Sequence, residues 1–118
     1  MAIVPGGRVE LTVDVPQSAL PARRALCLVE SGGDVELSVN GTAAADTTSQ
    51  PVVRSPFRSG LFVEYASPKH DTEHLDRAQD CRVYAVDPAS LAPGANAFVF
   101  RNATGQERQI ERLNLGLW

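Results

Sequence analysis

The sequence of 118 residues is poor in aromatic residues, with four Phe, two Tyr and one Trp, and it contains no long apolar run. No segment approaches the roughly 20 consecutive apolar residues that a transmembrane helix needs. Its eleven Lys and Arg are scattered and outnumbered by fourteen Asp and Glu, which gives a net charge of −3. No basic stripe is therefore available for nucleic acid or an anionic membrane, and we expect neither as a partner.

The N-terminus lacks the basic start and apolar core of a signal peptide, because residues 1–4 lead directly into Pro5-Gly6-Gly7. This opening is compatible with a domain excised from a larger protein, so the N-terminus does not set the cellular compartment. The length suits one domain, residues 1–118, with a single two-layer core.

Only two cysteines are present, Cys27 and Cys81, and each lies in an apolar, strand-like run. A disulfide between them would join neighbouring strands and indicate an oxidising compartment. The alternative is two buried free thiols that pack as small hydrophobic side chains. Neither cysteine has a second Cys or a His at zinc-finger spacing, so we predict no structural metal there.

Hydrophobic residues alternate along much of the chain. The segment RVELTVDV, residues 8–15, puts Val and Leu on one face and charged or Thr side chains on the other, which is typical of a half-buried antiparallel strand. Similar runs predict further strands at 25–30, 35–40, 61–65, 81–87, 96–102 and 108–118. Seven or eight short strands separated by turn residues predict an all-β fold, an antiparallel β-sandwich.

The segments between these strands are less regular. Asn40-Gly41 is a strong hairpin-turn signal, and Ser31-Gly-Gly-Asp is a second turn. Residues 42–60 read as a long loop with a short strand at Val52-Val53. Residues 66–80 are polar and favour a short helix from about Thr72, with Asp71 as its cap.

Two segments, VELSVNGT and VYAVDPASLAPGANAFVFR, resemble the galactose-binding-domain-like family of jelly-roll sandwiches, which are common appendages of bacterial glycoside hydrolases. The resemblance covers residues 8–118, and its specific part is these two segments. The residues that carry it are Val39-Asn40-Gly41, Tyr84, Val86, Leu91, Pro93-Gly94, Asn96, Phe98 and Phe100.

The second segment has a structural explanation. Pro93 fixes its own φ angle next to Gly94, which is free to adopt a left-handed conformation. The Asn96 side chain is placed to hydrogen-bond turn backbone. Leu91 closes the core before the turn, and the two phenylalanines after it alternate onto one face between the sheets. These residues therefore specify turns and core rather than a binding site.

The resemblance implies a glycan-binding module that uses loops at one end of the sandwich, with an extracellular or periplasmic location. It implies no cofactor beyond a structural calcium ion, and nothing in the sequence matches a complete calcium loop. The connection of more than forty residues between Gly41 and Tyr84 departs from the family pattern. Because sugar-binding residues vary among members, none is carried over by motif.

The candidate ligand-binding residues come instead from residue chemistry. Arg54 and Arg58 flank Phe57 in a loop bounded by Pro and Gly, where the ring could stack on a sugar and the arginines donate hydrogen bonds. Alternatively, Phe57 plugs the end of the sandwich. If Tyr65 or Trp118 is exposed, its ring offers a platform on which a sugar can stack. If they are packed, Tyr65 is a core residue and Trp118 covers the edge of the sandwich.

His70 and His74 are four residues apart in HDTEH, with Asp71 and Glu73 close by. On a helix this spacing would suit zinc. The alternative is a solvated polar loop, because a metalloprotease would need Glu directly after the first His. We keep His70 as a ligand-binding candidate and predict no metal site.

We expect no catalytic activity, because the sequence has no Gly-x-Ser-x-Gly elbow and its acidic pairs lack an apolar setting. Three functions stay open: a carbohydrate-binding module, a structural module that packs on a neighbouring domain of the same polypeptide, and a metal-dependent hydrolase built on HDTEH. The partner is correspondingly a carbohydrate or that neighbouring domain.

Overall fold

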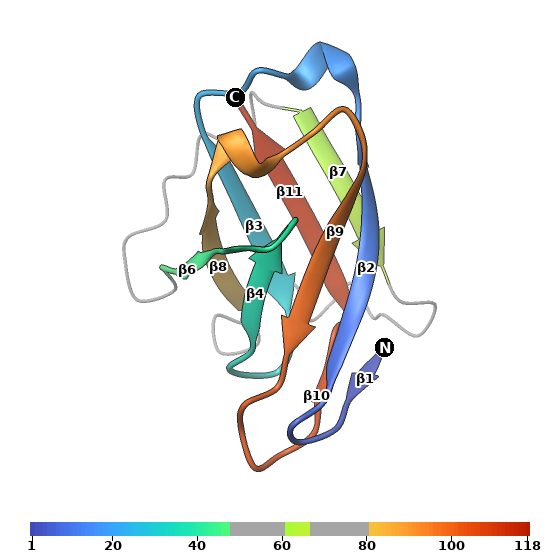
Figure 1. The fold of residues 1–118 in the computed structure, drawn as a ribbon. Coiled ribbons are helices and arrows are strands. Elements are labelled where there is room, and N and C mark those ends of the chain that lie inside the picture. The colour runs from blue at the N-terminus through green and yellow to red at the C-terminus, as the bar shows by residue number, and fades with distance from the viewer. Residues whose placement is uncertain (48–60, 67–80) are drawn as a thin grey trace.

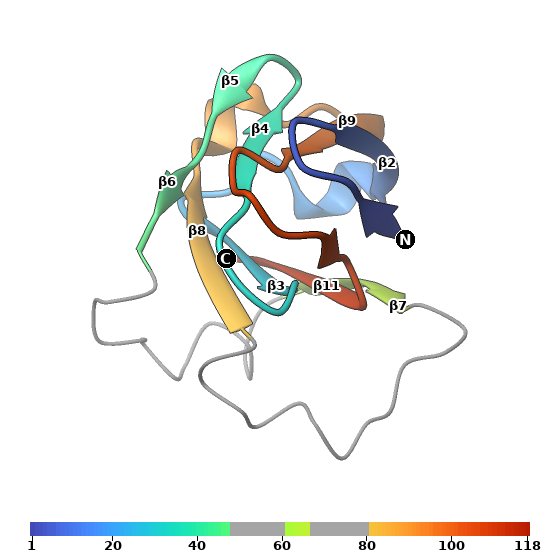
Figure 2. The same ribbon diagram turned by 90° about the horizontal axis from the view of Figure 1, so that it is seen from below.

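The computed structural model describes residues 1–47, 61–66 and 81–118, with residues 61–66 and Cys81 described through their backbone alone. The described chain is a sandwich of two antiparallel sheets (Figures 1 and 2). One sheet has the order β6 (Ala45–Asp46), β8 (Cys81–Val86), β3 (Ala25–Glu30), β11 (Arg112–Leu117) and β7 (Leu61–Ala66). The other has the order β2 (Arg8–Val15), β9 (Gly94–Arg101), β4 (Glu36–Val39) and β5 (Thr42–Ala43). The predicted all-β sandwich is confirmed.

Two smaller features complete the described fold. A two-stranded ribbon pairs β1 (Ala2–Ile3) with β10 (Arg108–Gln109). The helical segments of the described residues are single 3₁₀ turns, η1 (Gln17–Ala19) and η4 (Pro88–Ser90). Among these residues no helix has the length and apolar character needed to cross a membrane.

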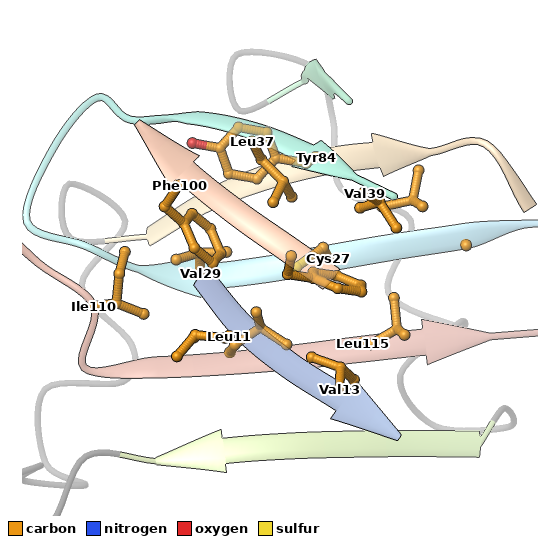
Figure 3. Packing of buried hydrophobic residues seen from close by; sticks show 14 of the residues in the cluster. Leu11, Val13, Cys27, Val29, Leu37, Val39, Tyr84, Phe100, Ile110 and Leu115 are labelled. Atoms are coloured by element: carbon orange, nitrogen blue, oxygen red, sulfur yellow. The ribbon is translucent and has the colours of Figure 1, made fainter. Parts of the chain in front are cut away.

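The core lies between the two sheets. Figure 3 shows Phe100 and Leu11 of the four-stranded sheet over Val29, Cys27 and Leu115 of the five-stranded sheet. Phe98 and Phe100 are both fully buried, as their alternation predicts. Full burial of a large apolar side chain contributes roughly 1.5–3 kcal/mol, so these layers account for much of the stability of the sandwich.

The long strands agree with the hydrophobic patterns. Strand β2 begins and ends at the predicted residues, and so does β3. Strand β3 is apolar on both faces because it lies in the middle of the five-stranded sheet, with Leu26 and Leu28 half-buried on its outer face. The hairpin at Asn40-Gly41 is confirmed, because both residues have positive φ angles, 49° and 86°, and join β4 to β5.

The sequence patterns missed three strands, β1, β5 and β6, each only two residues long, and the single strand predicted at 108–118 is two strands, β10 and β11. Strands this short show no periodicity. Two of them, β5 and β6, occupy the start of the predicted loop 42–60, which is therefore wrong for residues 42–43 and 45–46. The predicted strand at Val52-Val53 and the predicted helix from Thr72 lie outside the described residues.

The disulfide between Cys27 and Cys81 is wrong. Cys27 is a free, fully buried thiol. The register of β3 and β8 places Cys27 opposite Tyr84, whereas Cys81 lies opposite Glu30, three residues further along the strand. Three residues of strand span about 10 Å, which is beyond the Cα separation that a disulfide bridges. The alternative of a buried free thiol is confirmed for Cys27.

Candidate functional site

The candidate residues predicted from the sequence fall into three groups. Arg54, Phe57, Arg58 and His70 lie outside the described residues. The backbone of Tyr65 pairs with Leu113 in β7, and its side chain is also outside the described part. Trp118 is described with its side chain, and the candidate site is built around it.

Trp118 follows β11 and is held by the chain that leads into β3. Its carbonyl oxygen accepts hydrogen bonds from the backbone N–H groups of Arg23 and Arg24, at 2.9 and 3.0 Å. Its own N–H donates to the Arg24 carbonyl over 3.2 Å. These bonds continue the β3–β11 ladder by one step, and they fix the backbone of Trp118. Trp118 is half-buried, so part of this residue is open to solvent.

The same hydrogen bonds place two arginines next to the tryptophan. Arg23 and Arg24 are both exposed, and neither forms an ion pair within the described residues. Sequence reasoning missed this pair. Its only signal is two consecutive arginines between Pro21 and the strand that begins at Ala25. Their proximity to Trp118 depends on a contact between segments more than 90 residues apart, which local patterns do not reveal.

This tryptophan and these arginines lie at one end of the sandwich. Figure 1 shows the C-terminus at the end that also carries η1 and η4. The second of these turns is held by Asp87, whose Oδ1 accepts a hydrogen bond from the Ala89 N–H at 3.0 Å. The connection from β8 to β9 at this end is therefore fixed by its own hydrogen bonds.

A pair of asparagines fixes the same connection. The Asn96 side chain is buried, and its Nδ2 donates to the carbonyls of Ala92 and Gly94 at 2.8 and 2.9 Å. The Nδ2 of Asn40 donates to the Ser90 carbonyl at 2.7 Å. The predicted role of Asn96 in turn backbone bonding is confirmed, as is the left-handed Gly94, with φ at 87°.

The other described rings belong to the core. Phe98 and Phe100 are fully buried, and Tyr84 is 1% exposed. The hydroxyl of Tyr84 donates to the Val35 carbonyl, and burial, followed by the nearby Asp46 carboxylate, raises the pKa of this phenol. None of these three rings can serve as a sugar platform, which leaves Trp118 as the candidate among the described aromatic side chains.

Several charged residues at the opposite end have structural partners. Asp34 forms an ion pair with Arg82 at 2.9 Å, and the Arg108 Nε donates to the Asp34 carbonyl at 3.3 Å. Within β3 and β11, Arg112 lies opposite the buried Glu30, a cross-strand pair of opposite charge. These contacts hold the turn after β3 and the end of the sheet.

No group of three His, Cys, Asp or Glu that could hold a metal ion occurs among the residues with described side chains. The HDTEH segment lies outside these residues, so its two interpretations, a zinc site and a polar loop, both remain predictions. No protein-family model matches the chain, and no curated protein matches it.

Proposed function

We propose that this domain is a non-catalytic carbohydrate-binding module of the galactose-binding-domain-like type, with its ligand held at the end of the sandwich that carries Trp118. The observation that carries the proposal is the half-buried Trp118, whose backbone is hydrogen-bonded to the backbone of the exposed Arg23 and Arg24. The resemblance of the two turn segments to this family supports the same class of function.

The chemistry of these side chains suits a sugar. A sugar ring offers an apolar C–H face, which packs on an aromatic ring, and a rim of hydroxyl groups. A guanidinium presents five N–H donors in a planar fork, suited to hydroxyl oxygens and to carboxylates. The backbone bonds to Trp118 reduce the ordering that binding would require, which favours affinity.

The described surface gives less support to a purely structural module. Such a module should carry an apolar patch that a neighbouring domain covers. Among the described side chains, the large exposed hydrophobic residues are Met1 at 43% and Val4 at 59%, both next to β1. Two residues do not make an extensive docking face.

The single tryptophan provides a direct assay. Intrinsic fluorescence is recorded while sugars chosen from a glycan array are titrated, with and without calcium. Binding at Trp118 should shift or quench the emission in a saturable way. Arg23→Ala and Arg24→Ala should weaken binding about tenfold each, because each removes a charged hydrogen-bond donor. Arg101→Ala, an exposed arginine on β9 at the opposite end, is the matched control and should leave affinity unchanged.

The variants also locate the site. If Phe57→Ala or Arg58→Ala abolishes binding while the Arg23 and Arg24 variants do not, and Trp118→Phe still binds on the glycan array, the ligand sits on the predicted 53–60 loop instead. If a correctly folded protein binds no sugar in either calcium arm, the carbohydrate-binding proposal fails and the structural role takes its place.

A further inference from the structure

Strand β2 is an open edge of the sandwich. Among the described strands it is one of the two longest, with eight residues, and within the described part of the chain it pairs on one side only, with β9 (Figure 1). Among the described residues no segment pairs with its outer side. A free edge presents a row of unpaired N–H and C=O groups, which is a template for another strand.

The hydrogen-bond pattern shows which residues face that edge. The Asn102 N–H donates to the Gly7 carbonyl at 2.9 Å, directly beyond the β2–β9 ladder. Antiparallel residues alternate between bonding towards and away from the partner strand. Odd-numbered residues of β2 therefore bond to β9, and residues 8, 10, 12 and 14 turn their backbone groups to the free edge. The other side of β9 agrees with this, because the Ala97 carbonyl accepts a hydrogen bond from the Asn40 N–H at the end of β4. The backbone groups of odd-numbered residues of β9 therefore face β4 and point away from β2.

The side chains of these same four residues lie on the solvent face. Arg8, Glu10, Thr12 and Asp14 are all exposed, while Leu11 and Val13 are buried beneath the strand. No ion pair joins any of the four to another described residue. Charged residues on an edge discourage pairing with an arbitrary strand, so the occupant of this edge must complement their charges.

We propose that β2 pairs antiparallel with β2 of a second copy of this chain, in the register that sets Leu11 opposite Leu11 of the second copy. In this register Arg8 lies opposite Asp14 of the second copy, and the same pair recurs by symmetry. Glu10 then lies opposite Thr12. Each of these pairs joins residues whose backbone groups face the edge, so each exchanges hydrogen bonds in both directions.

The neighbouring registers do not complement. A shift that centres the pair on Glu10 places Glu10 opposite itself, and one that centres it on Thr12 places Glu10 opposite Asp14. Like charges directly opposite each other destabilise a sheet. A shift by a single residue sets buried positions against exposed ones, which the alternation of β2 forbids. Among the registers that pair at least five residues of β2 with the second copy, the charges thus select one.

The next strand reinforces this selection. Arg8 lies opposite Arg101 in β9, and Arg101 lies opposite Glu36 in β4. Two arginines are therefore adjacent in one row, with a carboxylate on one side only. The Asp14 carboxylate of a second copy would supply the missing negative charge beside Arg8, so the row would read Glu36, Arg101, Arg8, Asp14.

Sedimentation velocity or light scattering from about 10 μM to about 1 mM tests the pairing, because one strand pair buries little surface and suits a weak dimer. We expect the mass to rise towards that of two chains. Arg8→Asp or Asp14→Arg should each weaken association roughly tenfold, since two opposite-charge pairs become like-charge pairs. The charge swap Arg8→Asp with Asp14→Arg should restore it. Glu107→Arg, an exposed charge reversal away from β2, should change nothing.

Thr12→Pro gives an independent check. It removes an N–H that faces the free edge and leaves the β9 ladder intact, so it should abolish the dimer without unfolding the domain. Circular dichroism confirms the fold of every variant. A monomer throughout the concentration range, or a dimer that is unchanged by both single charge reversals, would overturn the proposal.

Discussion

The Asn40 side chain donates from Nδ2 to the Oδ1 of Asn96 over 2.8 Å, across 56 residues of sequence. Asn40 also accepts the Ala97 N–H through its own Oδ1 at 2.8 Å. The hairpin turn after β4 and the turn before β9 are therefore one hydrogen-bonded unit. These are the two segments that carry the family resemblance, and their shared function in the structure is to fix the turns at one end of the sandwich.

Replacing Asn96 should be the most costly change in this unit. Its Nδ2 bonds to three carbonyls, those of Val13, Ala92 and Gly94, and its Oδ1 accepts the Ala92 N–H. Asn96→Ala would leave several buried polar groups unpaired, so we expect a loss of about 2–3 kcal/mol in the free energy of unfolding. Urea denaturation measures this as a lower midpoint with an unchanged slope.

Asn114→Ala is the matched control for Asn96. Asn114 is half-buried in β11, and the change should cost within about 0.5 kcal/mol. Asn40→Gly keeps a residue that accepts the positive φ angle and removes only the side-chain bonds, so its cost should fall between the two. Equal losses for Asn96→Ala and Asn114→Ala would contradict the role assigned to Asn96.

The sequence predicted what local periodicity and turn chemistry encode. The alternation of Leu11 and Val13 located β2, and the Pro-Gly turn located Asn96 and its backbone bonds. It did not predict the approach of Arg24 to Trp118, because that contact depends on how distant segments pair in the sheet. Nor did it separate the two cysteine alternatives, since the three-residue offset between Cys27 and Cys81 is a matter of strand register.

Gly33 is a position where a side chain would meet the guanidinium end of Arg108. A Cβ atom added there would lie 2.7 Å from Cζ of the Arg108 guanidinium, and the φ angle of 152° is one that other residues rarely adopt. Gly33→Ala should therefore displace Arg108 from the turn and cost about 1–2 kcal/mol. Thermal or urea unfolding of the variant gives the value.

A double-mutant cycle separates the two causes of this loss. In an Arg108→Ala background the contact is absent, so Gly33→Ala should cost less there, and the remaining cost reports the backbone alone. Gly105→Ala is the control, because a Cβ at Gly105 meets nothing within 4 Å. Additive losses for Gly33→Ala and Arg108→Ala would show that the two residues are not coupled.

The stability of the domain should fall at high pH. Burial raises the pKa of Tyr84 above its ordinary value of 10.0, and burial also raises the pKa of Cys27 above 9.0. Above these ordinary values the unfolded chain releases protons that the native protein retains. The unfolded state then binds fewer protons, so the free energy of unfolding decreases as pH rises.

Tyr84→Phe isolates the phenol in this pH dependence. At pH 7 the variant loses the hydrogen bond to the Val35 carbonyl, which should cost about 1 kcal/mol. Between pH 9 and about 11 its stability should decline less steeply than that of the wild type, since one of the linked groups is gone. Urea unfolding across this range compares the two slopes, and parallel slopes would show that Tyr84 does not contribute.

Cys27 should be chemically silent in the native protein. Its thiol is fully buried, and burial raises its pKa, so little reactive thiolate forms and reagents have no access. In a Cys81→Ser variant, a coloured thiol reagent should modify Cys27 slowly in buffer and rapidly in urea at the same pH. The wild type, unfolded without reductant, should show both thiols. If the wild type needs prior reduction before both thiols react, Cys27 is paired. If Cys27 is labelled rapidly in the native variant, β3 opens far more often than a strand at the centre of the five-stranded sheet should.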